Sequence, residues 1–343
     1  MDITTRHRVT AVDIAQRLGL APTTVSHVLA GRAGRVRIKA ETQERVLQTA
    51  REMGYRTNAS ARAMRTGNFG CAAFIQPLRH MFLDPALLVG LSRGLEEVNM
   101  QLSVAHVADD VFGDDEYLPK IVRELAADGL FINAAFDFPQ GFLDAIATHR
   151  IPTVWINQRR EADCVFPDDF TGGVMGARHL LALGHERVAF AVANPSDPHY
   201  SVAERRGGYE AAMRDAGLAP RTFSLQSPLP GDHRLEGAAK MLLGPDRPTA
   251  VLAYEINTAL PILVAAARCG LEVPRDLSLV TFHGKIEFYS GADVTTLVAG
   301  WEQIGREAVR ALRRKIAEPD LSLPPLAVAP SLFAGLTCVP PRS

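Results

Sequence analysis

Four polar side chains lie close together near the start of a short predicted helix and could hydrogen-bond to the base edges or phosphates of DNA. They are Thr23, Thr24, Ser26 and His27. The helix begins at Pro22, whose missing N–H suits a first helical position. Its apolar residues Val25, Val28 and Leu29 recur at helical spacing and face inward. The polar side chains therefore point outward, toward a second molecule.

A preceding helix completes the pair that such recognition needs. Thr10 can cap its first turn, and Gly19 can end it as a left-handed cap residue. We expect one buried face made of its apolar residues, Val12, Ile14, Ala15 and Leu18. Two short helices joined by three or four residues form the unit that lays one helix in the major groove. An ordinary helical hairpin inside a larger core has the same pattern, so the alternative stays open at this point.

Charge separates the two parts of the chain. Residues 1–66 hold 12 Lys and Arg against 5 Asp and Glu, a net charge of +7. The remaining residues hold 25 basic against 33 acidic side chains, a net charge of −8, which the total of −1 hides. A basic first part on an acidic body suits a protein that neutralises phosphates at one end.

The first part resembles the LacI/GalR family of bacterial transcription regulators. Its matching motifs follow in the family's order and spacing: Val9–Ala15, Thr24–Gly31, Glu41–Leu47 and Gly54–Ala59. The resemblance implies a helix-turn-helix DNA-binding domain over residues 1–57, in which the second helix reads base edges. It also implies a third helix at about Ala40 to Met53, with Tyr55 and Asn58 beside the phosphate backbone.

The reading helix departs from the family at two positions. Ala21 stands where the family usually has a Ser cap, a loss of about 1 kcal/mol that Pro22 partly recovers. His27 stands where the family usually has Arg, and within the base-reading set of Pro22, Thr23 and His27 only the histidine can make a strong polar base contact. We therefore expect an operator half-site other than the family's commonest one.

Residues 58–68 are expected to form a hinge helix and linker. Asn58 can cap this helix and Gly67 can end it, but isolated helices shorter than about 12 residues are marginal in water. It should therefore fold only with DNA and a partner chain. In the family this segment pushes a leucine between central base pairs; here Met64 takes that place as an apolar wedge, and Arg62 accompanies it at the DNA. A plain linker is the alternative.

From residue 69 onward, short apolar runs alternate with helical patterns. These runs are Ala72–Ile75, Gly129–Ile132, Thr153–Ile156, Val188–Val192, Ala250–Ala253 and Leu277–Val280. Apolar strands between helices predict parallel sheets covered on both faces, and about 275 residues exceed what one such sheet needs. We expect two doubly wound parallel-sheet lobes.

The family resemblance extends over nearly the full length of the chain. Further motifs stand at Arg93–Glu97, Asp128–Gly129, Ile151–Pro152, His179–Ala189, Asp246–Ala250 and Val273–Ser278. The resemblance implies a periplasmic-binding-protein-like type I effector domain over residues 69–343, with three crossovers between its lobes. The expected N-lobe comprises residues 69–157 and 291–318, and the expected C-lobe comprises residues 162–288 and 322–340.

A small-molecule effector is expected beyond the carboxyl ends of the strands. Arg205 matches the family's ligand-binding arginine, a fork for a carboxylate or a pair of hydroxyls. The family's Asn-Asp pair and a later Asp are replaced by Glu255-Ile256 and His283. Either the effector is not a typical neutral sugar, and Arg205, Glu255, His283, Asn157 and Trp155 contact something charged or aromatic, or the pocket has lost small-molecule control. Packing within its strand is the alternative role for Trp155.

Other kinds of site find little support. The four cysteines are far apart without a CxxC, so neither a metal nor a disulfide framework is expected. The glycine-rich segment 171–176 lacks dinucleotide-binding spacing and is expected to let a helix start close to a strand. No nucleophile elbow or zinc motif is present, so we expect neither an enzyme nor a cofactor.

The sequence thus predicts a ligand-responsive regulator, most often a repressor in this family, that acts as a homodimer on a palindromic operator; a tetramer is also possible. The effector would be a sugar, a sugar acid or another charged metabolite. The first six residues do not form a signal peptide and no apolar stretch could cross a bilayer, so we expect a cytoplasmic protein. An exported solute-binding protein of the same effector fold is the alternative from another class, and a sugar-modifying enzyme is a remote third.

Overall fold

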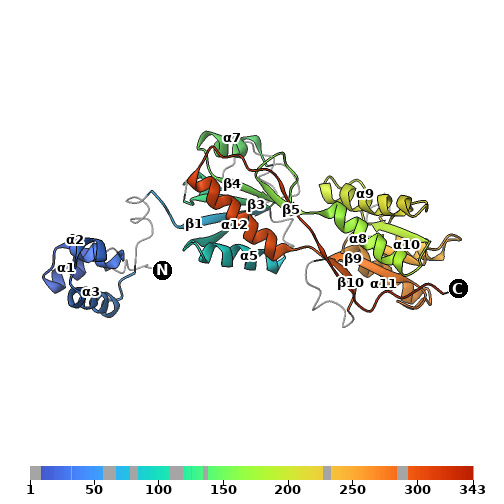
Figure 1. Cartoon of the computed structure of the whole chain (residues 1–343), viewed down its shortest axis with the longest axis horizontal. Coiled ribbons are helices and arrows are strands. Elements are labelled where there is room, and N and C mark those ends of the chain that lie inside the picture. The colour runs from blue at the N-terminus through green and yellow to red at the C-terminus, as the bar shows by residue number, and fades with distance from the viewer. Residues whose placement is uncertain are drawn as a thin grey trace, which may run out of the picture. The chain divides into compact units, whose positions relative to one another are not determined.

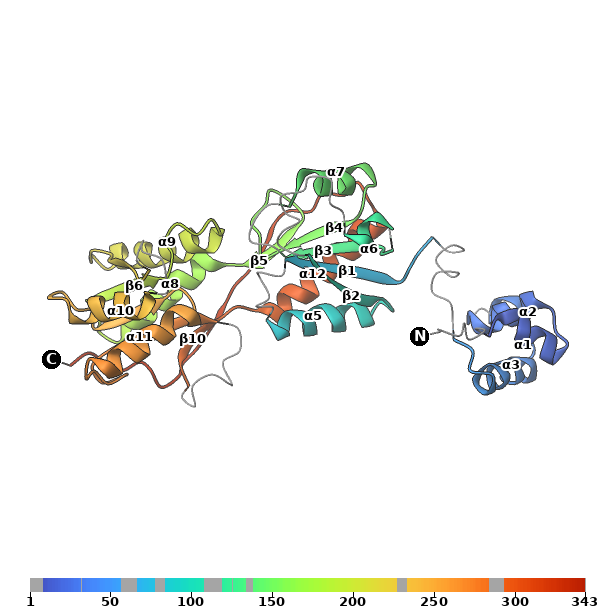
Figure 2. The same ribbon diagram turned by 180° about the vertical axis from the view of Figure 1, so that it is seen from behind.

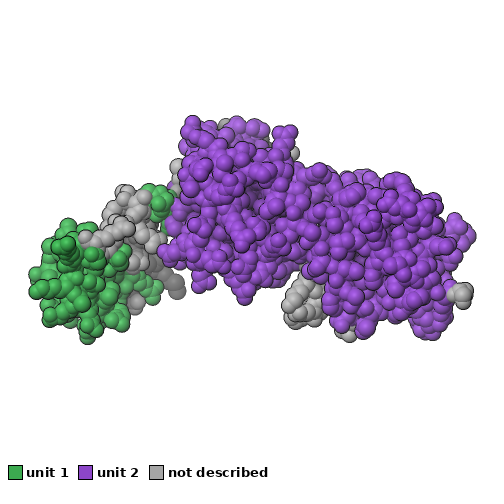
Figure 3. All heavy atoms as spheres, in the orientation of Figure 1, with its two compact units in different colours: residues 1–69 green, residues 70–343 purple. Residues whose placement is uncertain are grey.

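The computed structural model describes residues 9–31, 33–56, 67–77, 84–107, 119–124, 126–133, 138–226, 233–283 and 293–342. Asn58, Arg62 and Met64 of the expected hinge lie outside these residues. The chain divides into two compact units, residues 1–69 and 70–343 (Figure 3). We describe each unit by itself.

The first unit contains the expected three helices around a small apolar core. Its elements are α1 (Ala11–Leu18), α2 (Pro22–Leu29), the 3-10 turn η1 (Ala33–Val36) and α3 (Ala40–Glu52). Its buried core consists of Ile14, Ala15, Val25, Val28, Ala33, Val46 and Ala50. Because each helix contributes to this core, the pair α1 and α2 is not a hairpin within a larger core but part of a separate small unit.

The ends of α1 and α2 follow their local chemistry. The Thr10 hydroxyl accepts from the backbone N–H of Asp13 at 3.3 Å, and the Asp13 carboxylate accepts from the backbone N–H of Thr10 at 2.7 Å. This reciprocal pair is a capping box. Gly19 ends α1 at φ 63°, in the left-handed region. Ala21 supplies no side-chain cap to α2, which instead begins with Pro22.

The expected buried face of α1 is wrong at one residue. Val12 is 49% exposed, whereas Ile14 and Ala15 are buried. At 100° per residue, the inward stripe is formed by residues at positions 11, 14, 15 and 18, and Val12 falls outside it. Ala11 takes the expected place of Val12 beside the core.

The N-lobe of the second unit is one parallel sheet in the order β11-β5-β4-β3-β1-β2 (Figure 1). Its strands are β1 (Cys71–Pro77), β2 (Gln101–Val107), β3 (Gly129–Asn133), β4 (Thr153–Ile156), β5 (Cys164–Pro167) and β11 (Leu326–Val328). Its helices are α5 (Pro85–Glu96), α6 (Lys120–Arg123), α7 (Gln140–Thr148) and α12 (Trp301–Ala317). Helices α5 and α12 cover one face and α6 and α7 the other, as the two separate clusters of buried side chains require.

The C-lobe repeats this plan in the order β12-β10-β9-β8-β6-β7. Its strands are β6 (Val188–Val192), β7 (Thr222–Ser224), β8 (Ala250–Ala253), β9 (Ser278–His283), β10 (Thr295–Val298) and β12 (Ser331–Phe333). Its helices are α8 (Asp169–Ala182), α9 (Tyr200–Asp215), α10 (Arg234–Leu243) and α11 (Ile256–Arg268). The pairs α8 with α9 and α10 with α11 cover opposite faces. Only the edge strand β12 pairs antiparallel among the described strands.

The chain crosses between the lobes three times, as Figures 1 and 2 show. The crossings lie between β5 and α8, between β10 and α12, and between β11 and β12. The expected lobe ranges place β5 and β11 in the C-lobe and β10 in the N-lobe, and the strand pairing reverses all three. The physical reason is that β5, β10 and β11 each pair with the sheet of the lobe that the chain is about to leave. The chain therefore crosses after the strand, whereas the expected boundaries lie before it.

Glycines bring α8 and α9 into backbone contact. A Cβ at Gly173 would meet the carbonyl oxygen of Arg205 at 2.2 Å, and a Cβ at Gly208 would meet that of Phe170 at 2.0 Å. In addition, Gly172 faces the ring of Phe282 in β9. The glycine-rich segment therefore lets α8 approach a strand, as expected, and also a neighbouring helix. This contact fixes the first turn of α8 against the first turns of α9.

Candidate functional site

The outward face of α2 carries the expected base-reading side chains. Pro22 and Thr23 are exposed, while Thr24, Ser26 and His27 are half-buried. The Nδ1 atom of His27 is buried and has no hydrogen-bond partner among the described residues. An unpaired buried nitrogen is unfavourable in the free protein, so a partner that reaches it would remove that cost.

Thr10 and Tyr55 are the two expected DNA contacts outside α2 that the structure describes, and both are already held within the first unit. The Thr10 hydroxyl donates to the Asp13 carboxylate at 2.8 Å as part of the capping box. Tyr55 is half-buried and packs against the apolar core of this unit, and its backbone N–H donates to the carbonyl of Ala50 at 2.8 Å. Both residues therefore hold the ends of helices in place: Thr10 at the start of α1 and Tyr55 after the end of α3.

Arg205 of α9 is the centre of the second candidate site. Its Nε donates to Oδ1 of Asp169, at the start of α8, at 2.6 Å, and one terminal nitrogen donates to the carbonyl of Tyr254 at 2.6 Å. The side chains of Arg205 and Asp169 are 14% and 2% exposed. Burial alone would lower the pKa of Arg205, but the charge of Asp169 raises it above its usual range. The guanidinium is thus a fixed, buried cation.

Aromatic rings fix the plane of this guanidinium. Its carbon lies 4.3 Å from the centroid of Phe282 and 4.7 Å from that of Tyr254. With these rings beside it and two edges bound, the second terminal nitrogen is the part left to meet a ligand. Such a planar, pre-oriented fork suits a carboxylate or paired hydroxyls.

A chain of hydrogen bonds runs from this arginine to the other lobe. The hydroxyls of Tyr254 and Ser201 are 2.8 Å apart, and Ser201 lies 2.6 Å from Nδ1 of His199. The Nε2 atom of His199 lies 3.0 Å from the carbonyl oxygen of Asn157. Because a carbonyl only accepts, Nε2 carries the proton, Nδ1 accepts from Ser201, and Ser201 accepts from Tyr254. The expected residue Asn157 therefore takes part through its backbone carbonyl.

Glu255 and His283 lie at the carboxyl ends of β8 and β9. Glu255 directly follows Tyr254, and burial raises the pKa of its carboxyl, against the opposing effect of Arg205. His283 follows Phe282, and burial lowers the pKa of its imidazole, against the opposing charge of Asp84 from the N-lobe. Both are half-buried. The structure thus places Glu255 within electrostatic reach of Arg205, whereas the charged neighbour of His283 is Asp84.

Trp155 does not join this group. Its ring is 8% exposed and lies in the core on the α6 and α7 face of the N-lobe sheet. The guanidinium of Arg160 covers the ring at 4.1 Å, and Phe138 meets its edge at 6.3 Å. Its role in this structure is packing, the alternative that the sequence left open.

Sequence reasoning missed His199, Ser201 and Tyr254. The spacing of Ser201 and Arg205, four residues apart on a predicted helix, places them on one helical face and could have indicated Ser201. His199 and Tyr254 each flank a secondary-structure element, and only the tertiary structure brings them together.

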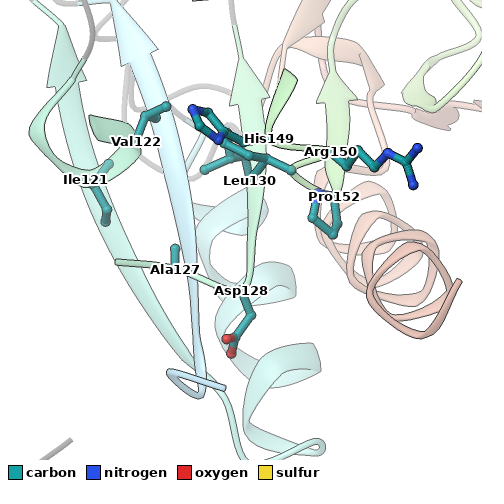
Figure 4. A pocket seen from close by; sticks show the side chains of 9 residues that line it. Ile121, Val122, Ala127, Asp128, Leu130, His149, Arg150 and Pro152 are labelled. Atoms are coloured by element: carbon teal, nitrogen blue, oxygen red, sulfur yellow. The ribbon is translucent and has the colours of Figure 1, made fainter. Parts of the chain in front are cut away.

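A small pocket of about 130 Å³ lies at the opposite end of the N-lobe strands (Figure 4). Leu130 and Pro152, at the starts of β3 and β4, contribute to its lining. The carboxylate of Asp128 and the guanidinium of Arg150 point away from the other lining residues. Asp128 instead accepts from the backbone N–H of Gly70 at 2.7 Å. This pocket is at the amino ends of parallel strands, where ligands of such sheets do not usually bind.

Metal and redox sites receive no support from the described part of the chain. In it, no group of three or more His, Cys, Asp or Glu side chains is placed to hold a metal ion. Cys71, Cys164, Cys269 and Cys338 are free thiols. Among the described helices, none combines the length and apolar character that a bilayer crossing requires.

Two family models match the chain in the order of its units. The model of bacterial regulatory proteins of the lacI family matches residues 10–58, and the periplasmic binding protein-like domain matches residues 177–338. The transcriptional regulator DegA of Bacillus subtilis (strain 168) is 27% identical over 330 residues, which cover 93% of this chain and 96% of DegA. The transcriptional repressor PurR of Vibrio vulnificus (strain CMCP6) is 23% identical, over 91% of this chain and 93% of PurR.

Solved structures share the fold. A Lac repressor dimer bound to operator and the anti-inducer ONPF matches with a TM-score of 0.79 and 20% identity, over 97% of this chain and 100% of that chain. A lacI-family regulator from Enterococcus faecium with bound ribose matches with a TM-score of 0.66 and 20% identity, over 79% of this chain and 100% of that chain. The relatives named here are regulators, and several match both units of the chain together.

Proposed function

We propose that the chain is a regulator of the LacI family, which it resembles over nearly its full length, and that it represses transcription in the cytoplasm as a homodimer on a palindromic operator. The observation that carries the proposal is the outward face of α2, on which Pro22 and Thr23 are exposed and His27 is half-buried. A half-site is short, so two copies of such a helix are needed to specify one operator.

The dimer is supported by the Lac repressor, whose fold this chain shares and which binds operator as a dimer. In our proposal, Thr23 and His27 read base edges, while Thr24, Ser26, Thr10 and Tyr55 contact phosphates. Asn58, Arg62 and Met64 would complete the contact in the minor groove. Replacing Met64 by Gly tests the wedge, because it should lower affinity for operator more than affinity for non-specific DNA.

The second half of the proposal is control by a charged small molecule bound around Arg205. The free terminal nitrogen of Arg205, the carboxyl of Glu255 and the imidazole of His283 offer both a donor and an acceptor within one region. Ribose is bound by one relative of this fold; the presence of Glu255 and His283 here favours a sugar acid or another charged metabolite instead. The hydrogen-bonded chain from Tyr254 to Asn157 would couple occupancy to the lobes' relative position.

The test combines two measurements on the full chain. Operator DNA is first selected from a random library with the wild-type protein. A regulator should enrich one operator sequence, whereas an exported solute-binding protein should enrich none. Sugars, sugar acids and nucleosides are then screened by thermal shift, since a ligand that binds only the folded state raises the melting temperature. The hit should change affinity for the selected operator. A screen in which only neutral sugars bind would reject the charged effector and keep the DNA-binding function.

A matched variant sharpens the second measurement. Glu255→Gln keeps the size of the side chain and removes its charge, so it should alter affinity for a charged effector while operator affinity without ligand stays unchanged. His283→Gln is the companion variant at the end of β9. If neither variant changes binding of the hit, these side chains are not part of the effector site.

A further inference from the structure

A pocket that both lobes line lies beside the face of α9 next to the one that carries Ser201 and Arg205. It has a volume of about 290 Å³. The N-lobe contributes Arg159, Phe166, Pro167 and Ala327, and the C-lobe contributes Asp169, Phe170, Tyr200 and Glu204, with Asp168 at the crossing between them. Its volume is close to the lower end of the range for small-molecule sites.

Helical geometry separates this pocket from the effector region. Tyr200 and Glu204 are four residues apart and share one face of α9, whereas Ser201 and Arg205 share the neighbouring face. Of the residues that line the pocket, Asp169 is the one that reaches Arg205. The first turns of α9 therefore divide two sites, with the buried ion pair between them.

Asp169 supplies an unmet hydrogen-bond acceptor at this pocket. The residue is 4% exposed, and its Oδ1 is already bound to Nε of Arg205 at 2.6 Å. Its Oδ2 is buried and accepts no hydrogen bond of regular geometry from the residues that the structure describes, although the Tyr200 hydroxyl lies close enough to interact with this carboxylate. A buried carboxylate oxygen in this condition carries a desolvation cost that a donor from a ligand would remove.

The remaining lining favours a cation with an apolar body. Three carboxylates line the pocket, those of Asp168, Asp169 and Glu204, against the single guanidinium of Arg159. Arg159 already forms an ion pair with Glu204 across the two lobes. The hydroxyl of Tyr200 donates to the carbonyl of Pro167 at 3.4 Å and also interacts with the carboxylate of Asp169, while Asp168 accepts from the backbone N–H and the hydroxyl of Thr171 as the cap of α8. The acceptors that a ligand would meet are therefore those of Asp169 and Glu204. The described carboxylates are not grouped to hold a metal ion.

Aromatic rings provide the apolar wall of the same pocket. Phe166 and Tyr200, from different lobes, meet edge to face with their centroids 5.7 Å apart. Phe170 lies in the first turn of α8 and is 43% exposed, which is unusual for so large an apolar side chain. Aromatic faces beside carboxylates are the usual surroundings of bound organic ammonium and guanidinium groups.

We propose that this pocket is a second ligand site, which binds a small organic cation whose ammonium or guanidinium group donates to Asp169 and Glu204 and whose apolar body lies against Phe166, Phe170 and Tyr200. The ligand touches both lobes, so it stabilises one arrangement of them. The site goes beyond the effector region around Arg205 and does not depend on DNA binding.

Calorimetric titration of the full chain without DNA tests this site. The probes are tyramine and agmatine, with 4-ethylphenol and 4-hydroxyphenylacetate as neutral and anionic compounds of the same aromatic body as tyramine. At least one cation should bind saturably at one site per chain. The neutral compound should bind roughly tenfold more weakly than tyramine, because a charge-assisted hydrogen bond is lost.

Variants locate the binding. Glu204→Gln and Phe170→Ala should each weaken binding of the cation by roughly tenfold, and both residues are exposed enough for the fold to tolerate the change. Glu210→Gln, farther along α9 and outside the pocket, is the matched control and should leave binding unchanged. Glu255→Gln marks the effector region and should also leave it unchanged.

Three results would overturn the second site. The first is that neither cation binds, the second is that the neutral compound binds as tightly as tyramine, and the third is that binding is lost in Glu255→Gln but kept in Glu204→Gln. The last result would place the cation at the effector region and leave the proposed regulatory function intact. Loss of operator binding has no bearing on any of these outcomes.

Discussion

His199 in the C-lobe donates a hydrogen bond from Nε2 to the backbone carbonyl of Asn157 in the N-lobe, over 3.0 Å. Asn157 has a φ of 59°, so its backbone is in the left-handed region that few residues other than glycine adopt. The carbonyl that accepts from His199 is therefore presented by an unusual backbone conformation. A neutral histidine thus forms one of the links between the lobes, beside the ion pair of Arg159 and Glu204.

This link makes stability depend on pH. Burial lowers the pKa of His199, and the carbonyl of Asn157 opposes that effect only in part. Above the unfolded value of about 6.5, both states are neutral and the full stability is present. As the pH falls below it, the unfolded state takes up a proton that the folded state resists, so stability is lost. His179, His185 and His283 shift in the same direction through burial.

Urea unfolding at pH 7.5 and 5.5 measures this dependence. Both tryptophans, Trp155 and Trp301, belong to the second unit, so their fluorescence reports on it alone. The free energy of unfolding should be lower at pH 5.5, and the difference should shrink in His199→Gln. His149→Gln, at an exposed histidine of the same unit, is the control. An unchanged pH difference in His199→Gln would reject the role of this imidazole.

Two neighbouring glycines of α9 should respond in opposite directions to the same substitution. A methyl group at Gly208 would meet the carbonyl oxygen of Phe170 at 2.0 Å, so Gly208→Ala must push α8 and α9 apart. We expect a loss of about 1–3 kcal/mol in the free energy of unfolding. At Gly207 the nearest atom is 3.7 Å away, on the Phe170 ring, so Gly207→Ala should stabilise the helix by about 0.5–1 kcal/mol. Equal effects in chemical denaturation would contradict the close helix contact.

The buried pair of Arg205 and Asp169 should be strongly coupled in stability. Either Arg205→Ala or Asp169→Ala leaves one buried charge unpaired and should cost about 3–5 kcal/mol. The double variant should cost less than the two single variants together, because no lone charge remains. A double-mutant cycle from urea unfolding provides the coupling energy. Additive losses would mean that packing, rather than the charge pair, explains the single variants.

His27 should carry much of the specificity for DNA. His27→Ala is expected to weaken binding to the selected operator by roughly 5- to 150-fold, the range of one good base contact, and to leave non-specific binding nearly unchanged. Fluorescence anisotropy at fixed salt concentration measures both affinities. Gln48→Ala, at an exposed position of α3, is the control for effects outside the reading helix. A parallel fall in both affinities would assign His27 to the phosphates instead.

Local pattern was enough to predict the helices of the first unit, but not every buried residue in them. The caps at Thr10 and Gly19 and the apolar residues of α2 are signals within a few residues of each other. Val12 shows the limit, because an apolar residue on the exposed face has the same appearance in the sequence as one in the core.

In the second unit, six of the buried strands were predictable, whereas the buried strands β5 and β10 and the edge strands were not. All six predicted runs are strands with continuous burial, such as β4 and β6. By contrast, β2 is an edge strand with alternating exposure, and β7, β11 and β12 are three residues each. Such strands are defined by the neighbouring strand with which they pair. The lobe boundaries depend on the same pairing, which the sequence does not show.

The candidate effector site likewise contains residues that the sequence could indicate and residues that only tertiary contacts bring together. Arg205 was found because a resemblance marks it, and Glu255 and His283 because each follows a predicted strand. The connection from Tyr254 through Ser201 and His199 to Asn157 depends on residues from three separate segments of the chain. No local spacing encodes that contact.

The three crossings also set an order of events during translation. The last strand of the N-lobe sheet is β11 and that of the C-lobe sheet is β12, within eight residues at Leu326–Phe333. Neither sheet can acquire its final strand until the ribosome has made the chain as far as these residues. The three-helix unit, in contrast, is made of contiguous residues and can fold as soon as it emerges from the exit tunnel. In a nascent chain, the three-helix DNA-binding unit would thus be folded long before the two lobes of the second unit are complete.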